Sequence, residues 1–523
     1  MRAIPLRAWV LAAVSAVLQV MPFSIAGPVP LWRRLFCWFC LVPLLVALLG
    51  DNRNGKALRP RQTAMLGYLC GVLWYLGNCY WIYPTMYLYG GIPKPASIGI
   101  LLLFALYLGL YHALFGFAIG ALRQRFLRNT ILLLAPVIWV AVELARGRIT
   151  GFPWDLLGYT QVDNFRLSGI AAWTGAMGLS LLIAWVNACW LLKPLGPKLR
   201  YLGPAAAILC VVLTTVLLLG SRSVPPTPHD ASAVLLQENL SVGKQGGERT
   251  ETKQQLLASF SALSLQAAAT GLLEKPKVVI WPEAPTDFYD ADPEFREALA
   301  SVAKRSGSPV IVDSIAIGPR AENGAEQIYN SANFFAADGT YAGRYDKMHL
   351  VPFGEYTPYK EFFFFAGHLL DNVGPFIPGS ERRVFSAGGH HYGVFICYES
   401  IFGDEIRQFA QMDADVLVNI SDDGWYGDTS APWEHLDMVR MRAIENHRWI
   451  VRATNTGVTA SIDPHGRIVA QMERHQRGAI DAPFGYLTDH TFYTRYGDWL
   501  AWLCALASVV AVAASFRRPG TVN

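Results

Sequence analysis

The stretch Tyr392-Gly-Val-Phe-Ile-Cys-Tyr-Glu-Ser400 joins a short apolar run to a polar turn. Residues 394–396 are apolar and follow Gly393, a pattern typical of a buried strand. Cys397 ends this run, so we expect its thiol at the tip of a strand, held rigidly and facing a cleft. A lone cysteine is more often a small buried apolar side chain, so its role depends on its neighbours. The other seven cysteines lie in strongly apolar segments: Cys37, Cys40, Cys70, Cys79, Cys189, Cys210 and Cys504.

A carboxylate also follows an apolar run, in Val279-Ile-Trp-Pro-Glu-Ala-Pro285. Glu283 stands between two prolines, which fix the backbone around it. We expect burial beside Trp281 to raise its pKa toward the range useful for proton transfer. The alternative is that Glu283 begins a helix.

A candidate ammonium group lies in the segment Gly343-Arg-Tyr-Asp-Lys-Met-His-Leu350. Lys347 in this segment would lower the pKa of a nearby thiol and stabilise an oxyanion, unless it is one more solvated or ion-paired lysine. Histidine is the commoner partner of a cysteine nucleophile. His390 and His391, the histidines nearest to Cys397 along the chain, are instead interpreted as turn residues at the start of its strand.

The composition indicates a membrane protein. Of 523 residues, 52% are hydrophobic and only 16% are charged, which is too apolar for an ordinary soluble enzyme. The formal net charge of +4 is small for this length, so no nucleic-acid partner is expected. With this length, two or more structural units are expected.

Seven apolar segments before residue 221, and an eighth near the C-terminus, are each long enough to cross a bilayer, which takes roughly 20 helical residues. The first could instead be a signal peptide, but no clear cleavage site follows it, so we interpret it as an anchor. The eight predicted spans are residues 8–25, 31–50, 62–84, 96–122, 130–147, 168–192, 203–220 and 497–515.

Lysine and arginine in the connecting loops predict the orientation, because cytoplasmic loops carry more of these residues. The loops after the second, fourth and sixth spans and the C-terminal tail are rich in them, whereas Arg33 and Arg34 after the first span are an exception. We therefore expect both termini in the cytoplasm and residues 221–496 on the opposite side. The predicted units are a bundle of seven helices over 1–220, a catalytic domain over 221–496, and an eighth helix with a tail over 497–523.

The sequence pattern of residues 221–496 differs from that of the predicted bundle, because short β-rich runs alternate with helical patterns. This alternation predicts an α/β domain. Asp338-Gly339 predicts the turn of a hairpin over residues 333–340. The predicted core strands are 233–237, 278–281, 310–313 and 416–419, and the predicted helices are 251–274 and 293–306.

Taken in the order Glu283, Lys347, Cys397, with their flanking residues, these motifs resemble the signatures of the nitrilase, or carbon–nitrogen hydrolase, superfamily. Two further segments, Gly151-Phe-Pro-Trp-Asp-Leu-Leu-Gly-Tyr159 and Val351-Pro-Phe-Gly-Glu-Tyr-Thr-Pro358, resemble the apolipoprotein N-acyltransferase family within it. Together with the predicted spans, this resemblance covers nearly the whole chain. It implies a multi-domain membrane protein: a bundle of eight transmembrane helices and an extracytoplasmic α/β nitrilase-like αββα sandwich.

The resemblance also implies a two-step acyl transfer. Glu283 would take the thiol proton of Cys397, and the thiolate would attack the sn-1 ester of a phospholipid, expected to be phosphatidylethanolamine. Lys347 and the backbone N–H of Tyr398 would hold the oxyanion. The resulting thioester would then acylate the α-amine of the diacylglyceryl-cysteine of an apolipoprotein. Amide formation from a thioester is downhill, so we expect no ATP, metal or other cofactor.

Further residues are assigned by the same resemblance. Glu355 is expected to orient Lys347 or the amine, and Glu399 to support the loop around the thiol. Some family members have a tryptophan for lipid contact in the loop that corresponds to residues 237–245. This chain has none there, so we assign that loop no lipid-binding role.

Aromatic residues near these motifs are candidates for lipid contact. Phe362-Phe-Phe-Phe365, with Phe362 and Phe363 foremost, is interpreted either as an arm that dips into the bilayer or as core packing. Trp425 and Tyr426 follow a predicted strand, where active-site loops are common in such folds, and could contact an acyl chain or the interface.

Three other patterns are interpreted as structural rather than catalytic or metal-binding. Asp422 and Asp423 lack a clustered third ligand, so we predict no metal site. Cys37-Trp-Phe-Cys40 has redox spacing but lies within a predicted span, which favours packing. Glu143 and Arg146 are three residues apart near the end of a span and are predicted to pair.

The preferred hypothesis is an acyltransferase of the bacterial inner (cytoplasmic) membrane with its catalytic domain in the periplasm. The first alternative is a membrane-tethered amidase of the same superfamily, with water as the acceptor. The second is a transporter carrying an inactive domain, although the predicted spans hold few charged residues for a polar path.

Overall fold

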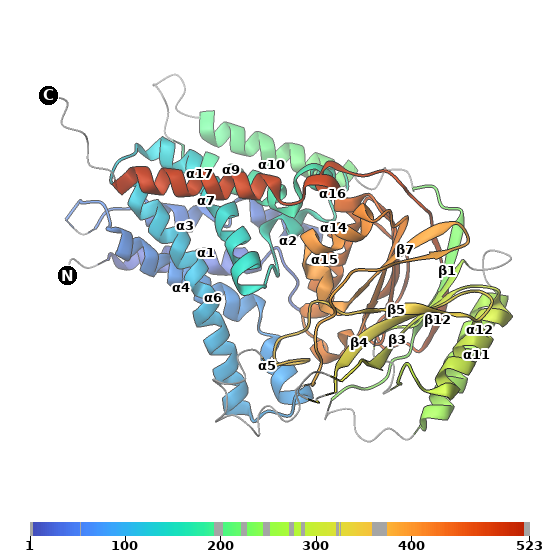
Figure 1. Ribbon diagram of the computed structural model, residues 1–523. Coiled ribbons are helices and arrows are strands. Elements are labelled where there is room, and N and C mark those ends of the chain that lie inside the picture. Colours follow the sequence, from blue (N-terminus) through green and yellow to red (C-terminus); the bar gives the residue numbers. More distant parts are fainter. Residues whose placement is uncertain are drawn as a thin grey trace.

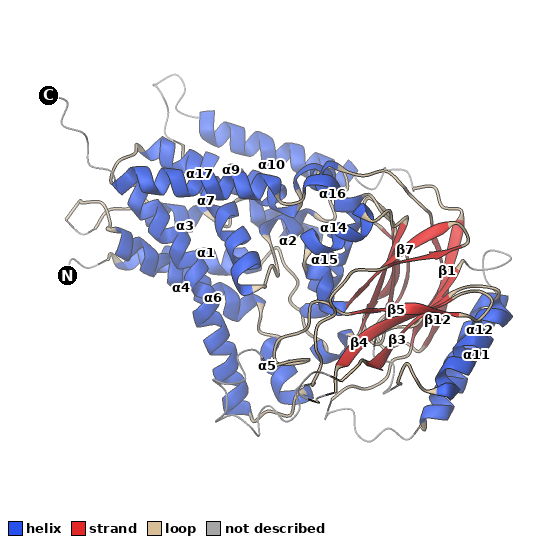
Figure 2. Cartoon of the chain, in the orientation of Figure 1, coloured by secondary structure: helices blue, strands red, loops and turns tan. Residues whose placement is uncertain are grey.

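The computed structural model describes residues 4–52, 54–192, 202–220, 227–243, 251–270, 277–283, 288–320, 324, 326–357 and 374–516. Within them, the strands form two six-stranded sheets that lie face to face at one end of the molecule (Figures 1 and 2). The first sheet has the order β12-β1-β2-β3-β4-β5 and the second β11-β10-β9-β8-β7-β6. Strands β1–β3 run parallel to one another, as do β7–β9, whereas the outer strands pair antiparallel.

The strands of the first sheet are β1 (Ala231–Gln237), β2 (Val278–Ile280), β3 (Val310–Ile317), β4 (Ile328–Phe335), β5 (Tyr341–Asp346) and β12 (Gly478–Phe484). Those of the second are β6 (Val384–Ala387), β7 (His390–Ile396), β8 (Val416–Ser421), β9 (Ile450–Thr454), β10 (Thr459–Ile462) and β11 (Ile468–Met472). All four predicted core strands are confirmed, as is the hairpin between β4 and β5. Gly339 in its turn has φ +84°, a conformation that favours glycine.

Helices cover the outer faces of both sheets and complete the predicted αββα sandwich (Figure 1). Alternation along β1 explains the layers, because Val234 and Leu236 face the helices while Ala233 and Leu235 face the other sheet. The first sheet is covered by α11 (Lys253–Ala269) and α12 (Pro293–Ser306), and the second by α14 (Gly403–Gln411) and α15 (Ala431–Asn446).

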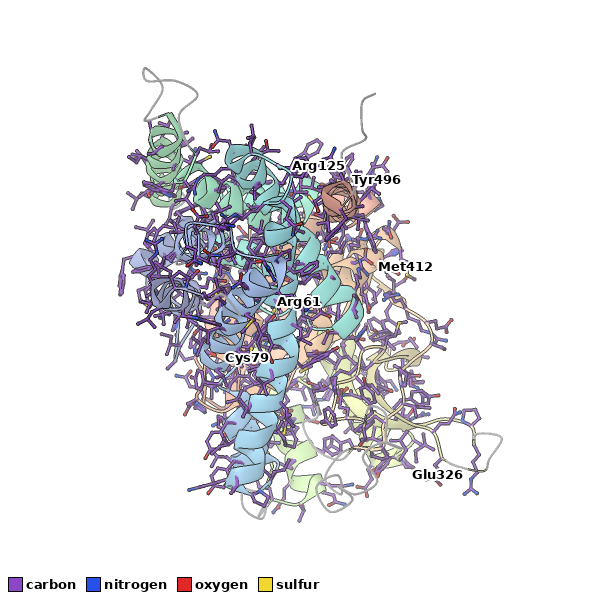
Figure 3. All side chains as sticks on the ribbon, turned by 90° about the vertical axis from the view of Figure 1, so that its left-hand side faces the viewer. Arg61, Cys79, Arg125, Glu326, Met412 and Tyr496 are labelled. Atoms are coloured by element: carbon purple, nitrogen blue, oxygen red, sulfur yellow. The ribbon has the colours of Figure 1, made fainter. Side chains whose placement is uncertain are left out.

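The rest of the chain forms a helical bundle beside the sandwich (Figure 2). Its helices are α1 (Leu6–Val20), α2 (Leu31–Arg34), α3 (Val42–Leu48), α4 (Pro60–Asn78), α5 (Ile82–Pro84), α6 (Lys94–Leu122), α7 (Arg128–Ala145), α8 (Ala171–Thr174), α9 (Ala176–Cys189), α10 (Leu202–Gly220), α16 (Phe492–Tyr496) and α17 (Trp499–Phe516). In Figure 3, which looks nearly along α10 and α17, α10 lies at the edge of the bundle, and only 11% of its span is buried.

Among the described residues, five helices are long and apolar enough to cross a membrane, and six if one bent pair counts as a single span. The bent pair is Ser168–Thr174, which includes α8, with α9, and the two parts turn by 119° at Gly175. Gly175 has φ +68°, and a Cβ there would lie 2.5 Å from the ring of Tyr493, so both conformation and space require glycine. Two predicted spans, 8–25 and 62–84, correspond to α1 and α4, which are shorter or less apolar.

Helix α15 joins the sandwich to the bundle. Two arginines and two aspartates form a ring of buried or half-buried ion pairs across this boundary. Arg34 of α2 lies 2.7 Å from Asp163 and 3.0 Å from Asp437 of α15. Arg440 lies 2.7 Å from Asp163 and 2.8 Å from Asp437. Because each arginine contacts both aspartates, the ring fixes α15, and the side chains it carries, relative to the bundle.

Candidate active site

Cys397 lies where the sequence places it, directly after β7 and at the first residue of a short 3-10 helix, η10 (Cys397–Ile401). It is buried, with 6% of its surface exposed. Its φ of +46° is in the left-handed region, which costs a non-glycine residue on the order of 1–3 kcal/mol. The chain therefore makes a tight, strained turn at this thiol, and the surrounding contacts must hold it.

Glu283 lies three residues beyond the end of β2 and is buried. Its Oε1 accepts hydrogen bonds from Lys347 Nζ and Asn330 Nδ2, each at 2.9 Å. Its Oε2 accepts the backbone N–H of Asp422 at 2.9 Å. Because Asp422 follows β8 of the other sheet, the carboxylate bridges the two sheets at the edge where Cys397 lies.

Lys347 follows β5 and is 1% exposed. Its Nζ lies 2.9 Å from Glu283 Oε1 and 2.8 Å from Glu355 Oε1. Glu355 also accepts Asn330 Nδ2 at 2.9 Å and the backbone N–H of Val351 at 2.7 Å. Burial opposes the charge of Lys347, but the two carboxylates outweigh it and raise its pKa well above the ordinary value. Lys347 is therefore an ammonium held between two carboxylates.

Charges of Glu283 and Lys347 both act on the thiol. Burial raises the pKa of Cys397 well above its ordinary value, Glu283 raises it further, and Lys347 offsets only part of this. Burial also opposes ionisation of Glu283, but Lys347 and the hydrogen bonds from Asn330 and Asp422 outweigh it and lower its pKa. The resting site thus holds a neutral thiol beside a carboxylate and an ammonium, so a proton must leave Cys397 when the thiol reacts.

One electrostatic prediction holds in direction and one is wrong. Lys347 lowers the pKa of the thiol, as predicted, but burial and Glu283 outweigh it and leave that pKa above its ordinary value. The pKa of Glu283 is lowered rather than raised. Trp281 does not desolvate this carboxylate, since its indole lies on the opposite face of the sheet, where its Nε1 donates to Ser264 Oγ at 2.9 Å.

Glu399 braces the turn around Cys397. Its Oε1 accepts Tyr345 Oη at 2.6 Å and the backbone N–H of Met348 at 2.7 Å, and its Oε2 accepts the N–H of Ile396 at 2.7 Å. Burial raises the pKa of Glu399. These contacts join the segment after β5 to the end of β7, as the supporting role predicted for Glu399 requires.

Tyr398 turns its side chain toward the helical bundle. Its hydroxyl donates to the carbonyl oxygen of Gly151 at 3.1 Å, and its ring packs edge-on against Phe402. The segment Gly151–Tyr159, which the sequence singled out, therefore reaches the residue next to Cys397. The helical bundle therefore contacts the turn at Cys397 through the side chain of this tyrosine.

The candidate lipid contacts differ in position. Trp425, in the 3-10 helix η11 (Asp423–Tyr426), is 44% exposed and free to meet a lipid. Tyr426 is buried and packs edge-on against Trp81 at 5.2 Å between ring centroids, so it lies inside the protein rather than at its surface. Its predicted contact with an acyl chain stays a prediction. Phe362 and Phe363, with the rest of that aromatic run, lie outside the described residues.

The structure also gives the positions of the residues that were interpreted as structural. His390 and His391 begin β7, at the end opposite Cys397. Glu143 of α7 and Arg146, which follows that helix, do not form the predicted ion pair: Glu143 Oε1 accepts Trp139 Nε1 at 3.0 Å, while Arg146 Nη1 donates to Tyr75 Oη at 3.0 Å. The two cysteines at redox spacing, Cys37 and Cys40, are buried free thiols.

The two acidic residues after β8, Asp422 and Asp423, make hydrogen bonds within the protein. In the described part of the chain, no three His, Cys, Asp or Glu side chains gather as metal ligands would.

Asn330 was not predicted from the sequence, although it donates to both Glu283 and Glu355. It lies near the start of β4, where Tyr329-Asn-Ser-Ala-Asn333 carries three polar side chains in a strand that is mostly buried. Polar residues in a buried strand need partners, and this excess is the signal that could have identified it.

Comparison with known proteins agrees with this geometry. Residues 6–189 match the family described as apolipoprotein N-acyltransferase N-terminal domain, and residues 241–484 match the carbon–nitrogen hydrolase family. The apolipoprotein N-acyltransferase of Geobacter metallireducens is 32% identical over 526 residues, covering 99% of this chain and 96% of that protein. That of Methylococcus capsulatus is 32% identical over 530 residues, covering 98% of this chain and 97% of that protein. The chain therefore belongs to the apolipoprotein N-acyltransferase family.

Proposed function

We propose that the protein transfers an acyl chain from a phospholipid to the N-terminal α-amine of a diacylglyceryl-apolipoprotein. The single observation that carries this is the cluster of Glu283, Lys347 and a strained Cys397, in contact with an apolar helical bundle through Tyr398. Membership of this family makes the protein an acyltransferase. Cluster and bundle together supply what such an enzyme needs, a nucleophile next to the source of its lipid donor.

In the first half-reaction, Glu283 accepts the thiol proton of Cys397 as the sulfur attacks the sn-1 ester carbonyl. Lys347 and the backbone N–H of Tyr398 stabilise the oxyanion. The C–O bond of the ester then breaks, Glu283 returns the proton to the leaving oxygen, and a lysophospholipid departs. A thioester on Cys397 remains. The lowered pKa of Glu283 means that the carboxylate is ionised at rest and has a free position for the proton.

In the second half-reaction, the α-amine of the acceptor attacks the thioester carbonyl. Glu283 accepts a proton from the amine, the C–S bond breaks, and the proton returns to the sulfur of Cys397. The products are an amide and the free thiol, so atoms and protons balance without a cofactor. Glu355 keeps Lys347 in place through its 2.8 Å contact, and Glu399 keeps the turn at Cys397 in place.

We propose the topology predicted from the sequence: seven spans within residues 1–220, a catalytic domain over 221–496 in the periplasm, and an eighth span within 497–523. The start of α1 and the end of α17 lie at the same end of the bundle, away from the sheets (Figure 1), which supports placing both termini in the cytoplasm. At this end, Arg123 of one basic loop pairs with Asp51 of another at 3.0 Å.

The arginines that depart from the charge rule have structural partners. Arg33 donates to the backbone carbonyl of Met21 at 2.7 Å, and Arg34 belongs to the ion-pair ring that holds α15. Arg148 lies 2.9 Å from Asp404 and 2.7 Å from Asp498. Structural partners of this kind account for arginines in loops that we assign to the periplasmic side, which supports an inner-membrane protein in the predicted orientation.

The experiment uses full-length protein in vesicles that contain phosphatidylethanolamine with an isotopically labelled sn-1 chain. Intact mass should show one acyl group on Cys397, and added diacylglyceryl-cysteine lipopeptide should remove it and appear N-acylated. Hydrolysis of an amide without an acyl adduct would favour the amidase with water as acceptor. Solute uptake without an adduct would favour a transporter. Either result would refute the proposal.

A further inference from the structure

His435 of α15 lies directly behind the turn at Cys397 and is fully buried. Its Nε2 lies 3.1 Å from the carbonyl oxygen of Cys397 and 2.6 Å from Ser400 Oγ. Its Nδ1 lies 2.9 Å from Oδ1 of Asp423, which follows β8. One imidazole therefore touches two residues of η10 and the acidic loop after the neighbouring strand.

The partners of this ring indicate where its hydrogens lie. A carbonyl oxygen can only accept, so the contact with Cys397 is a hydrogen bond when Nε2 carries the hydrogen, while Nδ1 lies beside Oδ1 of Asp423 and, at 3.4 Å, Nη2 of Arg452. Asp423 is suited to hold such a ring. Burial opposes its ionisation, but Arg452 and His435 outweigh burial and hold the pKa of Asp423 well below its ordinary value. Arg452 is held in turn by Asn419, so the carboxylate is fixed in place.

These contacts act on the strained residue itself. The left-handed backbone at Cys397 would relax toward the extended region if its carbonyl group could rotate. A hydrogen bond from His435 to that carbonyl opposes the rotation, and the contact with Ser400 holds the far side of the turn. We propose that His435, anchored by Asp423, is a positioning residue that holds the strained turn and so aims the thiol at the donor ester. This inference rests on the proposed role of Cys397 as the acyl carrier.

The same histidine connects the turn at Cys397 to the helical bundle. Trp154 stacks on His435, with ring centroids 6.0 Å apart and an angle of 15° between planes. Its Nε1 donates to Oε2 of Glu434 at 2.8 Å, on the residue before the histidine. Tyr398, on the residue after the cysteine, reaches the same bundle segment at Gly151. The segment therefore supports the turn from both sides without reaching the reacting sulfur through any of these contacts.

The test compares two amide replacements that each keep one half of the imidazole. In His435→Gln, the amide reaches the former Nε2 position and can still donate to the Cys397 carbonyl. In His435→Asn, it reaches only the Nδ1 position and can still donate to Asp423. Single-turnover thioester formation is measured by intact mass against vesicle phosphatidylethanolamine concentration. We expect His435→Asn to lower the maximal rate about 100-fold, as a misplaced reacting group does, with the half-saturating lipid concentration unchanged.

His435→Gln should retain the maximal rate within about tenfold, a rescue that general destabilisation would not give. The matched control is His447→Asn, near the end of the same helix. His447 Nδ1 also meets a carboxylate, Asp489 Oδ2 at 2.7 Å, and asparagine tolerates its φ of +50°. This control should leave the rate unchanged.

The possible failures are distinguishable. If wild-type protein forms no thioester at Cys397, the proposed function fails. If it does, and His435→Asn matches the wild-type rate or both variants lose rate equally, the positioning role is refuted and the function stands. Should His435→Asn not fold, His435→Gln decides alone: a rate within tenfold supports the role, and a 100-fold loss overturns it.

Discussion

Replacing Lys347 by methionine removes the ammonium that lies between two carboxylates at 2.9 and 2.8 Å, while keeping a side chain of similar length. Loss of one member of a buried ion pair costs about 3–5 kcal/mol, because the remaining charge is left without a partner. Loss of the oxyanion donor should slow thioester formation about 100- to 1,000-fold. We expect both effects in Lys347→Met.

The stability loss should depend on pH. In the wild type, the pKa of Glu283 is lowered, so its contribution to stability is present above its unfolded pKa of about 4.3 and is lost as pH falls through the folded pKa. Without the ammonium, burial is opposed only by the hydrogen bonds from Asn330 and Asp422, and we expect it to raise the folded pKa of Glu283 above about 4.3. In Lys347→Met, the stability that Glu283 contributes is then fully present below a pH of about 4.3, and it is lost as the pH rises through the folded pKa. The difference between the two proteins should therefore be larger at pH 7.5 than at pH 5.

The assay pairs thermal unfolding at these two pH values with single-turnover acylation by labelled phosphatidylethanolamine. Lys304→Met, on the exposed face of α12, is the matched control and should change neither quantity. An acylation rate equal to that of wild type would remove Lys347 from the proposed mechanism. A stability difference that is the same at both pH values would refute the assigned charge of Glu283.

Cys397→Ser should form no acyl adduct by intact mass and no N-acylated lipopeptide, whereas Cys504→Ser should behave as wild type; any transfer by the first variant contradicts the mechanism. Glu283→Gln keeps an oxygen for Lys347 but cannot take a proton, so single-turnover acylation should fall about 100- to 10,000-fold while the protein remains folded by thermal unfolding. An unchanged rate would exclude it as the base. Arg34→Met leaves two aspartates with one arginine and should lower the free energy of unfolding by about 3–5 kcal/mol; a difference below about 0.5 kcal/mol would show that the ion-pair ring does not hold α15.

Much of the fold could be predicted locally. Strand β7 was predicted from three apolar residues that follow a glycine, and α12 was predicted over the same residues that form it, 293–306. Burial of an apolar face and turn chemistry act between residues close in sequence, so they leave periodic patterns. The count of membrane spans was less accessible, because α1 and α4 are weaker apolar segments and a break at Gly175 divides another.

The sequence by itself also singled out Glu283, Lys347 and Cys397, because their short motifs follow apolar runs or a hairpin turn and together resemble the signatures of a known superfamily. Only the tertiary structure showed how the pKa values of these groups shift and which neighbouring side chains hold them in place. Trp281 faces away from Glu283, the pKa of Glu283 is lowered rather than raised, and His435 reaches the Cys397 carbonyl from a separate helix. Charge interactions depend on the distance between groups on different elements, and on the water removed from around them. Neither quantity is encoded in the spacing of residues along the chain.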